Sequence, residues 1–556
     1  MCIRHPCSVA GRHGYRPSTA RALCQRKERR RMFVKGQRRE PVTVANVRRR
    51  PRRATGFVLM HHRSLPLFND LSSFLSHLDE RGDVRHVQAP VSMHLEATEV
   101  HRRTIAKGGP VLRLEKPIDA QGRVSTFPVV TNLFGTRARV AAGLGTDLNG
   151  LDSFGKLLAW MRSPQAPRTL GEARDLLPAA RSALLARPRI VKAPPSWSEI
   201  PPDLSLLPVQ TCWPGDAGPL ITWPVVVTRA PGADDPGTYN LGIYRMQVID
   251  KDRAIVRWLP MRGGAAHHRM WAARCIDMPV AVVIGADPAT LLAAVMPVPE
   301  GVTELALSGM IGNKRPRLTA CGSIPLHVPA TAEIVLEGTV SAKETALEGP
   351  FGDHTGYYNG AEQYPVFRLN RIRVRDQACY LTTYTGRAPD EPSVLGDALT
   401  DVFKPLLRQQ IPEIRDVWLP PEASSYRIAV LSIAKKYPGQ ARRVMMGFWS
   451  LLPQFSMTKM LIVVDDDIDI RSWPDVMWAI GTRMDPSRDL MTVDRTPIDH
   501  LDFVSPLEGL GGKLGIDATR KVGSETIRDW GSELRMCPEI DRQVSQRWNE
   551  IFPEFG

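Results

Sequence analysis

Two stretches of the sequence contain the residue types that acid–base catalysis requires. One runs from Tyr239 to Arg245, and the other runs from Glu348 to Tyr358. Two carboxylates that lie close together do not both ionise freely, so one can stay protonated near neutral pH and donate a proton while the other orients it. Glu348 and Asp353, five residues apart, fit that requirement. We therefore treat this pair as the first candidate catalytic site.

Arg245 adds a cation to this pair if the fold brings it within reach. A guanidinium can hold one carboxylate, or it can grip a substrate carboxylate through two parallel hydrogen bonds. The same three residues could instead form a structural ion-pair network around the Gly349-Pro350 turn. The spacing alone leaves both interpretations open.

Oxygen ligands for a hard cation occur in two places. Asn240 and Glu304 carry the amide and carboxylate oxygens that Mg²⁺ and Mn²⁺ prefer, although they are far apart in the sequence. Their alternative roles are an Asx turn before a strand and a surface glutamate. The run Asp465 to Asp467 could also bind a cation, but its position after a predicted strand favours a solvated turn.

A further group of residues could bind a phosphate. Arg257, Arg262 and the backbone of Gly263-Gly264 combine positive charge with N–H groups that an anion can approach closely. A glycine pair after an arginine more often forms a hairpin turn. His267-His268 could supply ligands or bases, and the alternative is an exposed pair in a turn.

The positive charge of the chain is concentrated at its start. The chain has 556 residues, 43% hydrophobic and 24% charged, with a net charge of +15 that at first suggests nucleic-acid binding. Residues 1–60 hold 17 Lys and Arg against 2 acidic residues, which leaves 56 of each sign in the remainder. Nucleic acid is therefore not an expected partner of the folded part, which is long enough for several domains.

The first 59 residues show no apolar periodicity that would allow them to pack. Three interpretations compete: a disordered basic arm, an organelle transit peptide, or upstream sequence translated from a start placed too early. We favour the third, because the sequence becomes typical of a folded protein at Met60. A nucleic-acid or anionic-membrane binder driven by this arm would lose its function when residues 1–59 are removed, whereas an enzyme would keep its activity.

Cysteine spacing and hydropathy favour a reducing, cytoplasmic location. Of eight cysteines, the five beyond the arm are widely spaced and form no CxxC pair, so neither a zinc site nor a disulfide framework is expected. The most apolar window, 278–299, is interrupted by Asp287 and Pro288 and does not predict a membrane span.

The folded part opens with a helix and passes into a predicted sheet. Leu71, Phe74, Leu75 and Leu78 fall on one helix face, which Asn69 or Asp70 can cap and Gly82 can end. Short strands and helices follow up to a proline-rich boundary at 193–219. Residues 220–381 alternate between apolar runs and turns, which predicts a largely antiparallel sheet or barrel.

The pattern changes after Pro389. Predicted strands at 428–433 and 460–464 alternate with predicted helices at 440–452 and from Ser472, which indicates a doubly wound α/β domain. Residues 540–552 predict a final helix whose Trp548, Ile551 and Phe552 would dock on another surface.

Taken together, these residues resemble the UbiD family of prenylated-flavin-dependent decarboxylases, and within it the polyprenyl-hydroxybenzoate decarboxylases of ubiquinone biosynthesis. The resemblance extends from about Leu65 to near the C-terminus. It rests on the motifs Tyr239–Arg245, Arg257–Gly264, Glu348–Tyr358, Tyr384–Pro392 and Gly509–Lys513.

The resemblance implies a multidomain α/β fold. Its parts would be an N-terminal α/β region, a central split β-barrel like that of flavin reductases, and a C-terminal α/β domain with a tail helix exchanged between subunits. On this basis we expect an extension at 1–59, domains at 60–196, 197–388 and 389–530, and a tail helix at 531–556.

By matching position, the resemblance also implies roles for individual residues. Arg245, Glu348 and Asp353 would be catalytic, with Asp353 kept neutral as the proton donor. Asn240 and Glu304 would be metal ligands. The residues in contact with the flavin would be Ile243, Tyr244, Arg245, Arg257, Trp258, Leu259, Arg262 and Gly263. Family members commonly have a histidine ligand where this chain has Met261, and a thioether is a poor ligand for Mn²⁺, so water or His267 would complete the shell or metal affinity would be lower.

The implied reaction is a non-oxidative decarboxylation. Loss of CO₂ from an aromatic carbon leaves an electron pair in the ring plane, so a cofactor must act as an electron sink. The resemblance implies prenylated FMN joined through Mn²⁺ and often K⁺, and a 4-hydroxy-3-polyprenylbenzoate as substrate, giving the 2-polyprenylphenol. The alternative is a decarboxylase of the same family that acts on another aromatic or α,β-unsaturated acid.

The same resemblance names the expected partners. They are the prenylated aromatic acid, further copies of this chain in a hexamer, and the prenyl-flavin synthase that supplies the cofactor. A peripheral contact with the inner face of the cell membrane is expected as well, because the prenyl tail of the substrate partitions into lipid.

Overall fold

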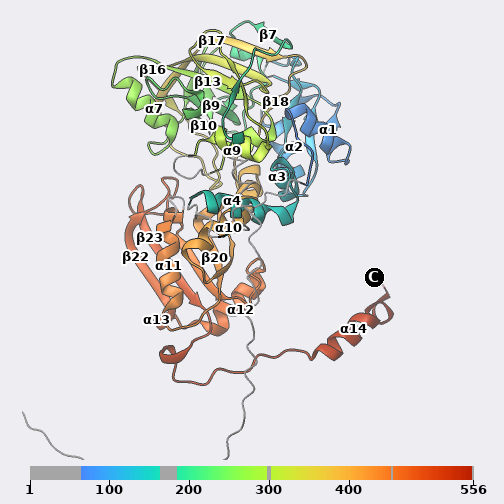
Figure 1. Ribbon diagram of the computed structural model, residues 1–556, viewed down its shortest axis with the longest axis vertical. Coiled ribbons are helices and arrows are strands. Elements are labelled where there is room, and N and C mark those ends of the chain that lie inside the picture. Colours follow the sequence, from blue (N-terminus) through green and yellow to red (C-terminus); the bar gives the residue numbers. More distant parts are fainter. Residues whose placement is uncertain are drawn as a thin grey trace, which may run out of the picture. The chain divides into compact units, whose positions relative to one another are not determined.

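The computed structural model describes residues 64–119, 121–162, 169, 184–296, 302–451 and 455–553, which all belong to one compact unit, residues 56–556 (Figure 1). The basic extension at 1–59 lies outside the described residues. None of the helices in the described part of the chain combines the length and the apolar character that crossing a bilayer requires.

The N-terminal region is a small mixed sheet with helices (Figure 1, blue). Its strand order is β1-β3-β5-β18, in which β18 returns from much later in the chain. The elements are α1 (Leu71–Asp79), β1 (Val84–Val87), β2 (Val91–Ser92), α2 (Glu96–Ile105), β3 (Val111–Leu114), β4 (Pro117–Ile118), β5 (Val129–Thr131), α3 (Arg137–Gly143), α4 (Leu151–Arg162) and β18 (Tyr380–Leu381).

Helix α1 confirms the predicted first helix, with Asp70 as its N-cap residue. The Asp70 side chain accepts the Ser73 backbone N–H at 2.8 Å, and Ser73 returns a bond to the Asp70 backbone, so the cap is a capping box. Leu71, Phe74, Leu75 and Leu78 are all buried.

The central part is one antiparallel sheet in the order β10-β9-β13-β16-β17-β12-β11-β8, with β7 on the other end of β17. Its strands are β7 (Trp197–Ile200), β8 (Leu220–Ile221), β9 (Pro224–Thr228), β10 (Asn240–Ile243), β11 (Met246–Val248), β12 (Arg253–Val256), β13 (Met278–Ile284), β16 (Ile334–Glu348) and β17 (Glu362–Arg375). The antiparallel prediction is confirmed. The sheet curls around its core, while a split barrel of the flavin-reductase type stays a prediction.

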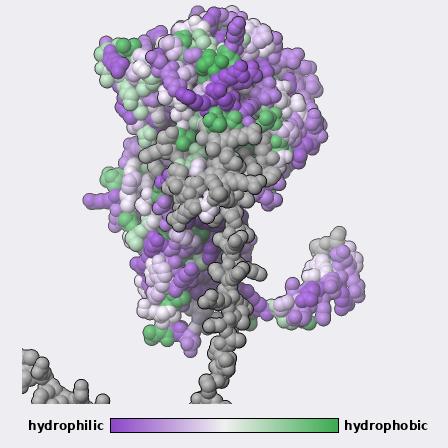
Figure 2. All heavy atoms as spheres, in the orientation of Figure 1, coloured by the Kyte–Doolittle hydropathy of each residue, from purple (hydrophilic) through white to green (hydrophobic). Residues whose placement is uncertain are grey.

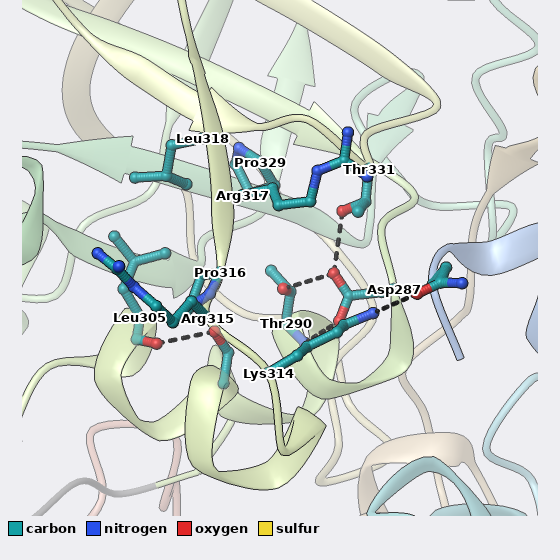
Figure 3. Close-up of a pocket in the computed structure, with 12 residues that line it drawn as sticks. Asp287, Thr290, Leu305, Lys314, Arg315, Pro316, Arg317, Leu318, Pro329 and Thr331 are labelled. Atoms are coloured by element: carbon teal, nitrogen blue, oxygen red, sulfur yellow. Dashed lines mark hydrogen bonds between the residues drawn. The ribbon is translucent and has the colours of Figure 1, made fainter. Parts of the chain in front are cut away.

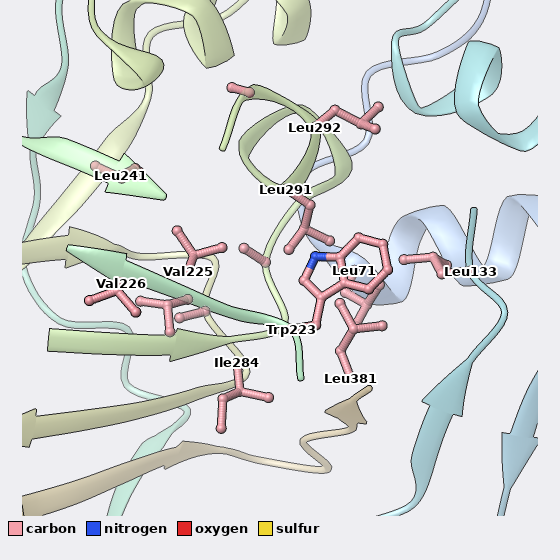
Figure 4. Close-up of a cluster of buried hydrophobic side chains, with 14 of the residues drawn as sticks. Leu71, Leu133, Trp223, Val225, Val226, Leu241, Ile284, Leu291, Leu292 and Leu381 are labelled. Atoms are coloured by element: carbon pink, nitrogen blue, oxygen red, sulfur yellow. The ribbon is translucent and has the colours of Figure 1, made fainter. Parts of the chain in front are cut away.

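Smaller elements flank the central sheet. They are β6 (Arg189–Ile190), α7 (Gly263–Ala272), α8 (Pro288–Ala293), α9 (Glu304–Gly312), β14 (Arg317–Ala320) and β15 (His327–Pro329). Figure 4 shows the core in which Leu71 of α1, Leu291 of α8 and Leu381 of β18 surround Trp223. Because this cluster joins the N-terminal helices to the central sheet, it fixes the end of the sheet that carries β10.

The C-terminal region is a five-stranded sheet in the order β19-β20-β21-β23-β22, parallel in its centre and antiparallel at both edges (Figure 1, orange). Its elements are α10 (Glu391–Gln410), β19 (Ile414–Trp418), β20 (Ile428–Ile433), α11 (Gln440–Leu451), β21 (Met460–Asp465), α12 (Trp473–Arg483), α13 (Pro486–Asp489), β22 (Leu490–Pro497) and β23 (Leu510–Ala518).

Helices cover both faces of this sheet, as the alternating pattern predicted. Leu431 of β20 packs in a cluster with Phe448 of α11, whereas its neighbour Val430 packs in another cluster with Val476 of α12. Successive strand residues point to opposite faces, so the two helices lie on opposite sides.

The Asp465 to Asp467 run was predicted as a solvated turn, which is confirmed for Asp466 and Asp467 but is wrong for Asp465, the last residue of β21. Asp465 is 9% exposed, and Arg483 Nη1 lies 2.8 Å from Asp465 Oδ2 and 2.9 Å from Asp467 Oδ1. The cation that satisfies these carboxylates is therefore an arginine of the same domain.

The chain ends with α14 (Pro538–Ile551). Ile540, Val544, Trp548 and Ile551 form a stripe along it and are each 40–45% exposed. An interaction surface would explain such a continuous apolar stripe on the exposed helix α14.

Figure 2 shows that hydrophilic residues predominate on the visible face of the molecule, with hydrophobic residues in separate patches.

Candidate active site

Two β-hairpins bring the predicted catalytic residues together. Strands β11 and β12 pair antiparallel with Met246 opposite Val256, so Arg245 and Arg257 meet at the end of this hairpin, where the Arg257 N–H donates to the Arg245 carbonyl at 3.2 Å. Strand β12 also pairs with β17, and β17 pairs with β16, whose last residue is Glu348. The loop that follows Glu348 carries Asp353.

Arg245 binds both carboxylates of the predicted pair. Its Nε and Nη2 donate to the two oxygens of Glu348 at 2.8 and 3.2 Å, and its Nη1 donates to Asp353 Oδ2 at 2.9 Å. The fourth acceptor is Asn359 Oδ1, 3.0 Å from Nη2. The Glu348 side chain is 0% exposed, so its charge depends on this arginine for compensation.

Arg257 approaches the same carboxylates from the other strand. Its Nη1 lies 3.3 Å from Asp353 Oδ2, and its Nε lies 3.9 Å from Glu348 Oε2. The site thus holds two guanidinium groups against two carboxylates.

The proposed role of Asp353 as a proton donor predicted a neutral carboxyl, and the structure corrects this prediction. Burial raises the pKa of Asp353, but the hydrogen bond from His354 and the charge of Arg245 outweigh burial and hold this pKa well below its usual range. Asp353 is therefore ionised at neutral pH, because each neighbour in this site stabilises the carboxylate rather than the acid.

The loop between β16 and β17 is held by side chains from other segments. Gln247 Oε1 accepts the Gly349 N–H at 2.8 Å, and Asp216 Oδ1 accepts the Gly352 N–H at 2.9 Å. A Cβ on Gly352 would lie 2.2 Å from Trp213 Cδ1, so glycine is required for this close approach. These contacts fix the position of Asp353, and spacing in the sequence gave no signal for them.

His354 connects this loop to the C-terminal region. Its Nδ1 lies 2.8 Å from Asp353 Oδ1, and its Nε2 lies 3.5 Å from Asp499 Oδ2. Tyr426 donates its hydroxyl to Asp499 Oδ2 at 2.9 Å. Burial opposes a charge on His354, but the two aspartates outweigh it and raise the pKa of His354 to about 9.

The residues predicted to hold a metal and a flavin lie around the start of α7. The Glu304 carboxylate accepts the Leu241 N–H at 3.2 Å, next to Asn240 at the start of β10. Burial raises the pKa of Glu304, so the alternative of a surface glutamate is wrong. A Cβ on Gly263 would lie 2.0 Å from Asn240 Oδ1, which places this amide oxygen against the first turn of α7.

Gly263 and Gly264 begin α7, with Arg262 as the preceding residue, so the hairpin-turn alternative is wrong. The Gly264 N–H donates to the Tyr244 hydroxyl at 3.3 Å, and the Tyr244 ring meets the Trp258 ring edge-on at 6.2 Å. Ile243 and Leu259, the remaining predicted flavin contacts, are half-buried beside them.

The two histidines after this glycine pair, His267 and His268, lie in α7. The alternative of an exposed pair in a turn is therefore wrong. His267 Nδ1 lies 3.0 Å from Thr228 Oγ1, and Thr228 Oγ1 also accepts from the Asn240 amide at 3.4 Å. His268 Nε2 lies 2.8 Å from the Ser341 carbonyl. Met261 is exposed, so His267 is better placed than Met261 to join Asn240.

The polar groups near α7 suit an anionic cofactor bound through a hard cation. N–H donors would face the anion, and the oxygens of Asn240 and Glu304 would face the cation. Buried polar atoms without a hydrogen-bond partner here include Arg257 Nε and Trp258 Nε1. Such groups are costly unless a ligand or water satisfies them. Within the described ranges, no three His, Cys, Asp or Glu side chains cluster as a metal site, so an ion here would need the Asn240 amide oxygen and water beside Glu304.

A separate cavity of about 30 Å³ lies between α8, α9 and β14 (Figure 3). Asp287 accepts from the hydroxyls of Thr290 and Thr331 at its edge, both at 2.9 Å. A cavity of this size holds about one water molecule. None of the candidate catalytic or flavin residues lines it, so it belongs to the packing of the fold.

Comparison with protein families decides the class of this site. Residues 75–158, 189–388 and 393–518 match the N-terminal, Rift-related and C-terminal domain models of the 3-octaprenyl-4-hydroxybenzoate carboxy-lyases. The chain belongs to the UbiD family. It is accordingly a carboxy-lyase of UbiD class, as the motifs had suggested.

Solved structures of other UbiD-class enzymes share the fold. The enzyme HmfF from Pelotomaculum thermopropionicum, in complex with FMN, is 29% identical, with a TM-score of 0.71 over 85% of this chain and 98% of that one. The vanillic acid decarboxylase of Sedimentibacter hydroxybenzoicus, in its closed form, is 26% identical, with a TM-score of 0.72 over 87% and 99%. The 3,4-dihydroxybenzoic acid decarboxylase of Enterobacter cloacae, at 20% identity and a TM-score of 0.68 over 88% and 100%, supports the fold alone.

Proposed function

We propose that this UbiD-family protein decarboxylates a 4-hydroxy-3-polyprenylbenzoate to the 2-polyprenylphenol without net oxidation, using prenylated FMN and a divalent cation. The observation that carries the proposal is the contact of Arg245 with both Glu348 and Asp353, beside the α7 segment. The family models that match this chain are named for carboxy-lyases of 3-octaprenyl-4-hydroxybenzoate, and this name supports a prenylated hydroxybenzoate as the substrate class.

Arg245 and Arg257 would bind and orient the acid. Their guanidinium groups already face two carboxylates, and a third carboxylate can share their remaining N–H groups. Glu348 would hold the Arg245 guanidinium in place, because its two bonds to Nε and Nη2 fix the plane of that group. Asp353 would deliver a proton to the carbon that has lost CO₂.

The residues around α7 would hold the cofactor. Arg262 and the N–H groups at Gly263 would face the phosphate, with Asn240 and Glu304 as ligands of Mn²⁺ and K⁺ as a second ion. Ile243, Tyr244, Trp258 and Leu259 would form the apolar side of the flavin site. When bound, the modified flavin supplies an electron sink for the reacting carbon. An evolved dimeric form of HmfF is described in complex with prenylated FMN, at 27% identity and a TM-score of 0.68 over 85% of this chain and 98% of that one.

The tail helix α14 would join subunits. Its apolar stripe, Ile540, Val544, Trp548 and Ile551, is exposed in the single chain, and covering it with another copy would remove apolar area from water.

The comparisons also support a second candidate substrate class, the unprenylated aromatic acids. The vanillic acid decarboxylase that shares this fold is named for an unprenylated aromatic acid. On this alternative the same residues act on a smaller aromatic or α,β-unsaturated acid.

One experiment tests the proposal and separates the two substrate classes. The protein is produced together with a prenyl-flavin synthase, and the released cofactor is characterised by absorbance and mass. CO₂ release is then measured with prenylated and unprenylated 4-hydroxybenzoate. We expect the mass of prenylated FMN and a higher kcat/KM for the prenylated acid; faster turnover of the unprenylated acid would favour the alternative, and no turnover of any aromatic or unsaturated acid would reject both.

A further inference from the structure

Asp353 uses its two carboxylate oxygens differently. Oδ2 accepts from Arg245 at 2.9 Å and from Arg257 at 3.3 Å. Oδ1 accepts from the backbone N–H and from Nδ1 of His354, both at 2.8 Å. Arginine does not give up a proton in proteins, and neither does a backbone amide. Among these partners, His354 is the group that can pass a proton to Asp353.

The far side of His354 meets the C-terminal region. Its Nε2 is buried and lies 3.5 Å from Asp499 Oδ2, just beyond an ordinary hydrogen bond. Asp499 is itself fixed by the Leu501 N–H at 2.9 Å, by the Tyr426 hydroxyl at 2.9 Å and by Arg427 Nη2 at 3.4 Å. The imidazole therefore lies between two carboxylates that come from different parts of the fold.

The charged groups around His354 favour its protonated form. Asp353 and Asp499 contact it, and Asp390 at the start of α10 is near enough to feel its charge. The opposing cations contact the aspartates rather than the ring: Arg245 and Arg257 bind Oδ2 of Asp353, away from His354, and Arg427 approaches Oδ2 of Asp499, the oxygen that also faces Nε2. Two carboxylates thus contact the imidazole, and the third, Asp390, interacts with its charge at longer range.

We propose that His354 is the proton relay for this site, supplying Asp353 through Nδ1, and that Asp499 of the C-terminal region holds it in the charged form. The inference rests on the proposed decarboxylation and adds to it the source of the proton. His354 does not touch the reacting carbon in this account, so it is a positioning and relay residue rather than a catalytic one.

The proton balance follows from these contacts. As the C–C bond breaks, CO₂ leaves without its bonding electron pair, which later forms the new C–H bond. The Nδ1 proton of His354 moves to Oδ1 of Asp353, and Asp353 passes a proton to the carbon, so His354 ends neutral and Asp353 ends ionised. A proton from water then recharges the imidazole. The net change is one carboxylate and one proton converted to CO₂ and one C–H bond.

Two conservative variants test the relay. His354→Asn places an amide N–H near the position of Nδ1, so the bond to Asp353 can persist without a transferable proton. Asp499→Asn keeps an acceptor for Nε2 but removes the charge. His500→Asn is the matched control, because this neighbouring histidine is exposed and pairs with Glu508 at 3.5 Å.

The measurements are the pH profile of kcat and the exchange of the product C–H hydrogen in D₂O, which reports proton transfer without CO₂ release. FMN affinity is measured in each variant to show that the site is folded. For the parent we expect kcat to fall as pH rises through about 9. In Asp499→Asn this fall should move to lower pH by about one unit or more. In His354→Asn, kcat and the exchange rate should both fall by about 100-fold with the basic limb lost.

The control variant should match the parent in every measurement. If the parent is active but the pH profiles of His354→Asn and Asp499→Asn superimpose on it, the relay is overturned while the proposed function stands. If a parent that binds flavin decarboxylates no aromatic or unsaturated acid, the proposed function falls and the relay falls with it.

Discussion

Arg245 Nε lies 2.8 Å from Glu348 Oε1, and the Glu348 side chain has no contact with solvent. A buried carboxylate without its partner keeps the cost of lost hydration but loses the attraction that offsets it. The pair is therefore a structural requirement of the site as well as a candidate part of its chemistry.

Arg245→Ala should lower the free energy of unfolding by about 3–5 kcal/mol, because it removes both hydrogen bonds to the buried Glu348 and leaves only Arg257 Nε, at 3.9 Å, near that carboxylate. The double variant Arg245→Met/Glu348→Gln should recover most of this loss, since neither charge is then buried alone. Urea unfolding followed by circular dichroism measures both values. A single-variant loss under about 1 kcal/mol would mean that Glu348 is not held as a charge by Arg245.

Gly263→Ala should weaken FMN binding without unfolding the protein. The added methyl would lie 2.0 Å from Asn240 Oδ1 and displace that amide from the start of α7. Gly481→Ala in α12 is the control, because its methyl meets nothing within 4 Å. The control should keep flavin affinity and gain about 0.5–1 kcal/mol of stability. Fluorescence quenching of FMN, titrated with and without Mn²⁺, gives the affinities; equal affinity in both variants would remove Asn240 from the cofactor site.

Glu391 should make the protein less stable as pH rises from about 4.5 to 7. Burial raises its pKa from 4.5 to about 7, so in this window the folded state keeps a proton that the unfolded chain has lost. Glu391→Gln keeps an acceptor for the Phe134 N–H, which Glu391 Oε1 accepts at 2.7 Å, and carries no charge. The variant should exceed the parent by about 3 kcal/mol at pH 8 and equal it below pH 4.5, at 1.36 kcal/mol per pKa unit. If the unfolding midpoints of parent and variant change in parallel between pH 4.5 and 8, the raised pKa of Glu391 is contradicted.

Charge placed on the tail stripe should dissociate the oligomer. Val544→Asp/Trp548→Asp introduces two charges into the face that we expect to be covered by another subunit. Light scattering after size exclusion should show a smaller assembly than the parent, whereas Gln546→Glu, off this stripe, should leave the assembly unchanged. An unchanged mass for the double variant would exclude α14 as a subunit contact.

Local patterns predicted the elements well where a single signal dominates. The strand at Ile428–Ile433 and the helix capped by Ser472 appear with the expected starts, because apolar runs, caps and prolines act within a few residues. By contrast, the chain breaks between β10 and β11 at Tyr244-Arg245 without a cap or a proline to mark the break. At that break Arg245 leaves the strand ladder and its side chain reaches Glu348. This contact depends on the pairing of β11 and β12 with β17 and β16, which are far away in the sequence.

The site was predictable in its residue types but not in its protonation. Arg245, Glu348 and Asp353 were candidates by their chemistry, but their spacing left a structural ion-pair network open, and the resemblance to the family motifs selected the catalytic interpretation. The ionised state of Asp353 depends on His354 and Arg245, and the state of His354 depends on Asp499, 145 positions further along the chain. Sequence spacing carries no information about such long-range contacts.

The most direct test compares the parent with Asp353→Asn and Glu348→Gln, each purified with its flavin loaded and quantified. CO₂ release from a prenylated 4-hydroxybenzoate is measured at equal flavin content. The account predicts that both variants keep the flavin and lose at least about 100-fold in kcat, because proton delivery and the orientation of Arg245 are removed. Release of CO₂ at the parent rate by correctly folded, loaded variants would contradict it.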